Sequence, residues 1–169
     1  MAVDWSTRMS VMQTASTSRL DGAALEAWRS YLQTHASILR ELDAALLARH
    51  GMTARDYEVL LYLAQADQRR LPMSSLAERT MLTRSGITRL VDGLVDAALV
   101  ERVSCPSDAR ISYAELTDAG YERLREAGCT QVATINRLFL ERFEPDEIEL
   151  LASLLRRLPG AHQGSCTVS

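Results

Sequence analysis

The stretch from Leu71 to Gly120 reads LPMSSLAERTMLTRSGITRLVDGLVDAALVERVSCPSDARISYAELTDAG. Its apolar residues first recur with the spacing of an amphipathic helix, and beyond Leu99 that period is lost. Turn-forming residues separate the parts. The pattern predicts two short helices joined by a turn, followed by a two-stranded β-hairpin.

The second predicted helix begins at Thr83, whose hydroxyl can accept a hydrogen bond from an unpaired amide of the first turn. An apolar stripe then recurs at i, i+3, i+4 and i+7; its residues are Ile87, Leu90, Val91 and Leu94. The residues left on the outward face are Arg84, Ser85, Thr88, Arg89 and Asp92. Arginine, serine and threonine hydrogen-bond base edges and phosphates. This face can therefore read DNA, although an ordinary amphipathic helix with a solvated side has the same pattern.

The elements on either side support the first interpretation. Upstream, Ser74 is predicted to cap a short helix that ends near Thr80. Downstream, residues 99–104 and 111–116 are rich in strand-forming side chains, and residues 105–110 between them have turn chemistry. Arg110 follows Asp108 by two positions at the tip, where a carboxylate can orient a guanidinium toward a narrow groove.

These elements together predict a mainly α-helical protein with a small β-wing, a winged helix-turn-helix that binds double-stranded DNA. The DNA-binding residues expected from the pattern are Ser74, Thr83, Arg84, Ser85, Thr88, Arg89, Asp108 and Arg110.

The segment from Ile87 to Gly120, in its order and pattern, resembles the multiple-antibiotic-resistance-regulator (MarR) family, and the resemblance extends over residues 21–159. It implies a dimeric bacterial transcriptional regulator that leaves DNA on binding small phenolic or other ligands, or on oxidation. The family's recognition-helix arginine matches Arg89, and its wing motif matches Asp108 and Arg110. The Leu-Thr pair that closes the second wing strand matches Leu116 and Thr117.

Two residues depart from the family pattern. Ala98 stands where many members have the glycine that ends the recognition helix, so this helix is expected to close without the usual left-handed residue. Ala109 replaces a second wing arginine, which weakens the expected anchoring of the wing.

Charge argues against a broad DNA-binding field, because the chain carries a net charge of −3. Residues 69–125 hold nine arginines against eight acids and form the least acidic part. DNA affinity should then depend on a few placed arginines. Asp92, Asp96 and Glu101 are expected to point away from DNA.

Residues 21–50 and 117–159 are predicted to form a helical dimerisation region. An alternating 3,4 spacing runs through Leu25, Trp28, Leu32, His35, Leu39, Leu42 and Leu46. Thirty helical residues reach roughly 45 Å, too far for the core of one small lobe. A second long helix is expected from Thr117 to Phe143, and a third opens at Pro145. The partner is expected to be a second copy of the chain.

A ligand pocket is predicted between the first long helix and a helix over residues 54–66, where His35 interrupts the apolar seam. The residues expected to line it are Trp28, Tyr31, His35, Tyr57 and Tyr62. Aromatic rings with a few polar tips suit a phenol or an aryl acid. The alternative is that these are core or interface residues whose polar ends are satisfied, which is the more common role of such side chains.

Other chemistry finds little support in the sequence. The chain has no Gly-x-Ser-x-Gly elbow, no phosphate-binding glycine loop and no zinc signature, so we expect neither an enzyme nor a cofactor or metal. Three unpaired cysteines, and no apolar run of about 20 residues, are typical of a cytoplasmic protein. Cys105 in the wing can sense oxidants, and Cys129 is expected to be packed.

The sequence therefore predicts a homodimeric transcriptional regulator, a repressor relieved by a small aromatic or phenolic ligand on a pseudo-palindromic operator. A redox regulator acting through Cys105 and a helical protein-interaction module stay open as alternatives. The predicted winged domain covers residues 53–116. Residues 1–20 are expected to be a mobile segment and residues 160–169 a tail.

Overall fold

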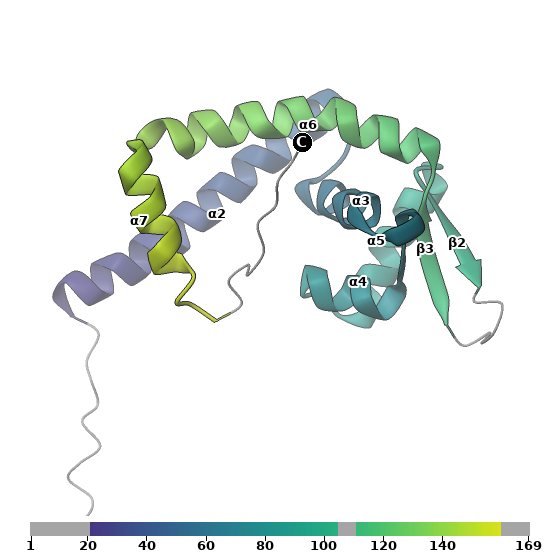
Figure 1. Ribbon diagram of the computed structural model, residues 1–169, viewed down its shortest axis with the longest axis horizontal. Coiled ribbons are helices and arrows are strands. Elements are labelled where there is room, and N and C mark those ends of the chain that lie inside the picture. Colours follow the sequence, from purple (N-terminus) through teal and green to yellow (C-terminus); the bar gives the residue numbers. More distant parts are fainter. Residues whose placement is uncertain (1–20, 105–110, 160–169) are drawn as a thin grey trace, which may run out of the picture. The chain divides into compact units, whose positions relative to one another are not determined.

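The computed structural model describes residues 21–104 and 111–159. Its contacts divide the chain into two units, residues 1–37 and residues 38–169, and Figure 1 labels most of the elements. The chain is mostly helical with one small antiparallel sheet, which confirms the predicted fold class. The elements are α2 (Gly22–His50), α3 (Ala54–Gln65), η1 (Asp67–Arg69), β1 (Arg70–Pro72), α4 (Met73–Thr80), α5 (Arg84–Asp96), β2 (Val100–Ser104), β3 (Ser112–Leu116), α6 (Asp118–Leu138), η2 (Leu140–Arg142) and α7 (Pro145–Leu155).

Helix α2 confirms the long first helix predicted from the seam, and only the C-terminal end of that seam is buried. Leu42 and Leu46 are buried in the second unit. In the first unit, Trp28 and Leu32 are 51% and 45% exposed. The N-terminal half of the seam is therefore an apolar surface.

The core of the second unit lies between α3, α4, α5, the sheet and the start of α6. Among its fully buried side chains are Leu60 and Leu63 from α3, Leu76 from α4, and Ile87 and Val91 from α5. Each such side chain stabilises the fold by about 1.5–3 kcal/mol relative to an exposed one. These residues hold α5 by the predicted stripe, so its polar side faces outward.

Three threonines begin three of the helices through their side chains. The Thr53 hydroxyl accepts from the Asp56 amide in a reciprocal capping box, and Thr83 does the same for the Gly86 amide at the start of α5. Thr117 caps α6. Helix α5 thus starts where the sequence predicts, whereas the predicted cap at Ser74 is wrong. Helix α4 already begins at Met73, because the fixed φ of Pro72 suits the position before a helix.

The sheet has three strands in the order β1-β3-β2, all antiparallel. Strands β2 and β3 confirm the predicted hairpin to within one residue, and Val100 lies opposite Leu116 while Ser104 lies opposite Ser112. Strand β1 was not predicted. It pairs Arg70 with Glu115 across a long sequence separation, and its three residues are too few for a visible alternation.

The two helices before the wing both end in left-handed residues that are not glycine. Met81 after α4 has φ 54°, and Ala98 after α5 has φ 57°. The Ala98 amide donates to the Val95 carbonyl, and the Leu99 amide donates to the Leu94 carbonyl. These two bonds form the Schellman pattern that closes a helix. The expectation that Ala98 would avoid the left-handed conformation is therefore wrong; hydrogen bonds on both sides of the residue hold the alanine in it.

Helix α6 ends earlier than predicted, at Leu138, and η2 follows before α7 begins at Pro145. Phe139 leaves helical geometry with φ −129° although no glycine or proline marks the place. None of the described helices is both long and apolar enough to cross a membrane.

Candidate nucleic-acid interface

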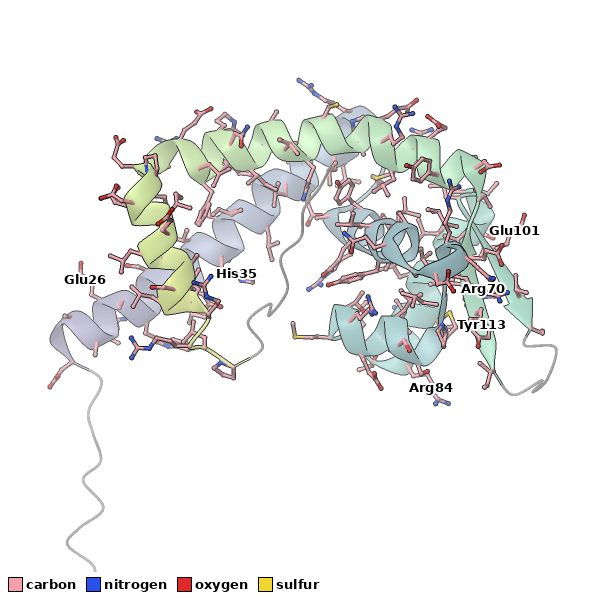
Figure 2. The ribbon with its side chains drawn as sticks, in the orientation of Figure 1. Glu26, His35, Arg70, Arg84, Glu101 and Tyr113 are labelled. Atoms are coloured by element: carbon pink, nitrogen blue, oxygen red, sulfur yellow. The ribbon has the colours of Figure 1, made fainter. Side chains whose placement is uncertain are left out.

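The outward side of α5 forms one continuous polar surface. An open hollow is lined by Thr83, Arg84, Ser85, Thr88, Arg89 and Asp92. Arg84, Ser85 and Arg89 are exposed, and Figure 2 shows Arg84 on the side of this unit opposite α6. Within the described ranges no carboxylate pairs with Arg84 or Arg89. Both guanidinium groups are thus available to an anionic partner.

Two of the hydroxyl groups on this surface make hydrogen bonds with the backbone of α5 itself. The Thr83 oxygen lies 3.1 Å from the Gly86 amide that it caps and 3.2 Å from the Ser85 hydroxyl. The Thr88 hydroxyl donates to the Arg84 carbonyl at 2.8 Å. Thr83 and Thr88 therefore shape the surface, and Ser85 is the more accessible hydroxyl.

Asp92 lies on this surface, contrary to the expectation that it points away from DNA. It lines the same hollow as the two arginines, because it follows Thr88 by four positions and so lies one turn further along the same side. Arg102 of β2 donates from Nη2 to its carboxylate at 2.8 Å. The negative charge is thus paired. Asp96 and Glu101 are exposed and lie outside the hollow.

The hairpin extends from the domain on the same side as Arg84. Strands β2 and β3 both reach toward this side (Figure 1). The predicted wing residues Cys105, Asp108, Ala109 and Arg110 lie outside the described residues. Ser74 is exposed near the start of α4, so it belongs to a different helix from the other predicted contacts.

Thr117 and Gly120 join the start of α6 to the end of α5. The Thr117 hydroxyl oxygen accepts a hydrogen bond from the Gly120 amide. The same hydroxyl donates toward two carbonyl oxygens, that of Ala98 at 2.9 Å and that of Leu99 at 3.1 Å. A Cβ on Gly120 would stand 2.1 Å from the Leu99 carbonyl oxygen. Only glycine allows the chain segments to approach so closely.

Sequence reasoning did not single out Arg102. A usable signal existed, because Arg102 follows Val100 by two positions and strand side chains alternate between faces. Val100 is 1% exposed, so Arg102 leaves the sheet on the side that carries the core and α5. A charged residue at an inward strand position indicates a partner on the helix that covers it.

The five residues predicted to bind a ligand belong to two groups. Trp28, Tyr31 and His35 form a ladder along α2, with ring centroids 6.1 and 6.2 Å apart. On α3, the Tyr62 hydroxyl donates to Glu58 and the ring lies beside Arg79, whereas Tyr57 lies near Gly128 of α6. Burial raises the pKa of both phenols, and Glu58 raises the pKa of Tyr62 further.

Cysteine and the metal-binding side chains are the remaining candidates. Cys129 is exposed, so the expectation that it is packed is wrong; it immediately precedes the buried Thr130 in α6. No group of three or more metal-binding side chains is found in residues 21–104 and 111–159.

Comparison with known proteins links this surface to one family. The model described as MarR family matches residues 50–111. One similar structure is that of Sco3205, a MarR family transcriptional regulator from Streptomyces coelicolor solved in complex with DNA. The sequences are 33% identical and the TM-score is 0.78, and the match covers 82% of this chain and 90% of the Sco3205 chain. AbsC, a second MarR family transcriptional regulator from the same organism, is 31% identical to this chain with a TM-score of 0.78. The match covers 83% of this chain and 95% of the AbsC chain. The transcriptional repressor YetL from Bacillus subtilis is 27% identical over 143 residues, 82% of this chain and 84% of YetL.

Proposed function

Because this chain belongs to the MarR family of DNA-binding transcriptional regulators, we propose that it is a repressor that binds a pseudo-palindromic operator as a homodimer. The observation that carries the proposal is the outward side of α5, where two arginines that pair with no carboxylate of residues 21–104 and 111–159 share one open surface. A helix with this surface fits the major groove, where an arginine can make two hydrogen bonds to a guanine. The repressor relatives support the sign of regulation.

Arg89 and Arg110 have different roles in this proposal. Arg89 lies on the exposed side of α5 and reads base edges, as the recognition-helix arginine of the family does. Arg110, oriented by Asp108, enters the minor groove from the hairpin tip and anchors the complex. Arg84 and Ser85 stand at the first turn of α5, where backbone amides also favour phosphate.

The second copy of the chain is supported by apolar side chains that are exposed in the part of the chain that the structure describes. On α2, Trp28, Leu32 and Leu39 are exposed, and on α7 the same holds for Leu150 and Leu154. Water contact with such stripes is unfavourable, and exposed apolar patches commonly mark interfaces between proteins. Two copies joined through α2, α6 and α7 would present two α5 helices to half-sites about 10 base pairs apart.

An aromatic or phenolic effector is the finer part of the proposal. The stacked ladder of Trp28, Tyr31 and His35 offers flat rings with one polar end, and Tyr57 and Tyr62 offer phenol groups on α3. A ligand weakens DNA binding only if it binds the DNA-free conformation more tightly. We therefore expect an effective aryl acid or phenol to quench Trp28 fluorescence and to release DNA over the same concentration range, and His35→Leu to blunt both.

The DNA-binding roles are tested by selecting operators from a random duplex library with the full chain and then measuring variants by competition. Arg89→Ala should flatten the preference at one or two symmetric positions, because a bidentate guanine contact is worth about 1–3 kcal/mol of discrimination. Arg110→Ala should weaken binding to most sequences and reduce its salt dependence. Asp108→Ala should act as a milder version.

Arg125→Ala is the matched control, because Arg125 is an exposed arginine of α6 whose one ion pair among the described residues is with Glu122 at 3.1 Å. It should bind as the wild type does. If Arg89→Ala and Arg110→Ala also bound as the wild type does, the assigned DNA-binding surface would be wrong. Identical specificity profiles for these two variants would contradict the division of roles between them.

A further inference from the structure

Arg102 connects the first wing strand to the middle of the polar side of α5. Its Nη2 atom donates to the Asp92 carboxylate at 2.8 Å and to the Thr88 carbonyl at 3.3 Å. The two acceptors are one helical turn apart, so a single nitrogen contacts α5 between consecutive turns. The Arg102 side chain is 33% exposed and that of Asp92 55%.

This contact is the only ion pair between α5 and the sheet in the part of the chain that the structure describes. Covalently, α5 and β2 are joined at one end, through Ala97, Ala98 and Leu99. Arg102 adds a second connection nearer the hairpin tip, between the two elements that face DNA in the proposed function. With both connections, the angle between helix and strand is restrained at two points.

The pair also changes the charge that DNA meets. Asp92 lines the same hollow as Arg84 and Arg89, where an unpaired carboxylate would repel phosphates. Arg102 offsets that charge without leaving the sheet. This ion pair explains how the acidic Asp92 can lie on a surface that is otherwise suited to bind an anion.

We propose that Arg102 is a positioning residue for DNA recognition, which sets the angle of the wing against α5 and compensates the charge of Asp92. This inference rests on the proposed function. Its distinguishing feature is that Arg102 acts through Asp92, so removing either partner should have related effects on specificity.

The experiment compares the full-length wild type with Arg102→Gln, Asp92→Asn, their double variant and Arg102→Lys. For each protein, affinity is measured for the selected operator and for random duplex of equal length at several salt concentrations. Arg69→Gln is the matched control, because the Arg69–Asp118 pair at 3.0 Å also joins two elements but lies outside the α5 surface. Urea unfolding of each variant reports its stability.

Arg102→Gln should lower operator affinity severalfold and by no more than about 25-fold, because an exposed pair is worth up to about fivefold and the two contributions in a dimer multiply. Random-duplex affinity should fall less, so the ratio of operator to random affinity drops. Asp92→Asn should lower the same ratio, and the double variant should lower it no further than Arg102→Gln alone. Arg102→Lys should keep most of the ratio, since an ammonium group can reach both oxygens. Arg69→Gln should leave it unchanged.

Three results would overturn the proposal. If Arg102→Gln keeps the wild-type ratio, the positioning role is wrong while DNA binding by the wild type still stands. If the two single effects simply add in the double variant, Arg102 contacts DNA independently of Asp92. Arg102→Gln could unfold more easily than Arg69→Gln, and its loss of specificity would then be ambiguous. In that case Arg102→Lys provides the test. If a stable Arg102→Lys variant loses the ratio of operator to random-duplex affinity, the positioning role is wrong. A wild type without any operator preference would remove the proposed function itself.

Discussion

Helices α5 and α7 are similar in length, with 13 and 11 residues, and each carries an apolar stripe. Helix α5 buries Ile87, Val91 and Leu94 against its own chain. Helix α7 buries no residue fully within the described ranges, and Leu150 is 60% exposed. The same pattern thus has two outcomes: α5 is held in place by its own chain, and α7 leaves an apolar face exposed.

The largest effect is expected for Val91→Asp. Val91 is fully buried, and an unpaired carboxylate in the core costs several kcal/mol, a large part of the 5–15 kcal/mol that a typical domain has. The variant should lose the cooperative unfolding transition that circular dichroism records for the wild type. A folded variant with a normal urea midpoint would show that α5 is not anchored by its stripe.

Leu154→Asp places the same charge on α7, where the native leucine is 46% exposed. The urea transition of the winged domain should persist, whereas sedimentation should show a monomer at micromolar concentration, since a charge at an apolar interface is costly to bury. Glu149→Asp, a conservative change at an exposed α7 position, is the control and should leave the dimer intact. A dimeric Leu154→Asp would remove α7 from the proposed interface.

Gly120→Ala should destabilise the domain by roughly 1–3 kcal/mol, because the added Cβ overlaps the Leu99 carbonyl oxygen and overpacking costs about that much. Gly93→Ala in α5 is the matched control. A Cβ there meets nothing within 4 Å, so the substitution should gain about 1 kcal/mol of helix propensity. Urea midpoints that shift in the same direction for both variants would contradict the close approach at Gly120.

Ala98→Gly should have the smallest effect, a stabilisation of about 1 kcal/mol. The left-handed conformation costs a residue with a Cβ about 1–2 kcal/mol, and the greater freedom of glycine in the unfolded chain offsets part of the gain. Ala97→Gly, at a neighbouring residue with φ −83°, should destabilise instead. Thermal unfolding of both variants measures the difference, and equal melting temperatures would be inconsistent with strain at Ala98.

Local patterns predicted most of the winged domain. Thr83 marks the start of α5 because a hydroxyl cap acts on the next three residues, and the Ile87 to Leu94 stripe is a property of one helix. The hairpin follows from strand-forming residues around a turn. Each of these signals acts within about ten residues, so no knowledge of the tertiary structure is needed.

The features that sequence reasoning missed depend on segments that meet only after folding. Strand β1 exists because Arg70 and Pro72 meet β3 more than forty positions later. The position of Asp92 on the recognition surface makes sense only beside Arg102, ten residues away across a turn. Ala98 keeps a left-handed backbone because hydrogen bonds around it, including that of Thr117, leave no alternative. Propensity alone cannot report such compensation.

The Thr117 junction makes α6 a lever arm. The helix has 21 residues and is therefore about 31 Å long, and its N-cap residue Thr117 donates to the carbonyls that follow α5. With a pivot there, a sideways shift of about 3 Å at the far end of α6 corresponds to a rotation of about 5° at the recognition helix. A pivot at Thr117 would therefore turn a small displacement at the far end of α6 into a change in the orientation of α5.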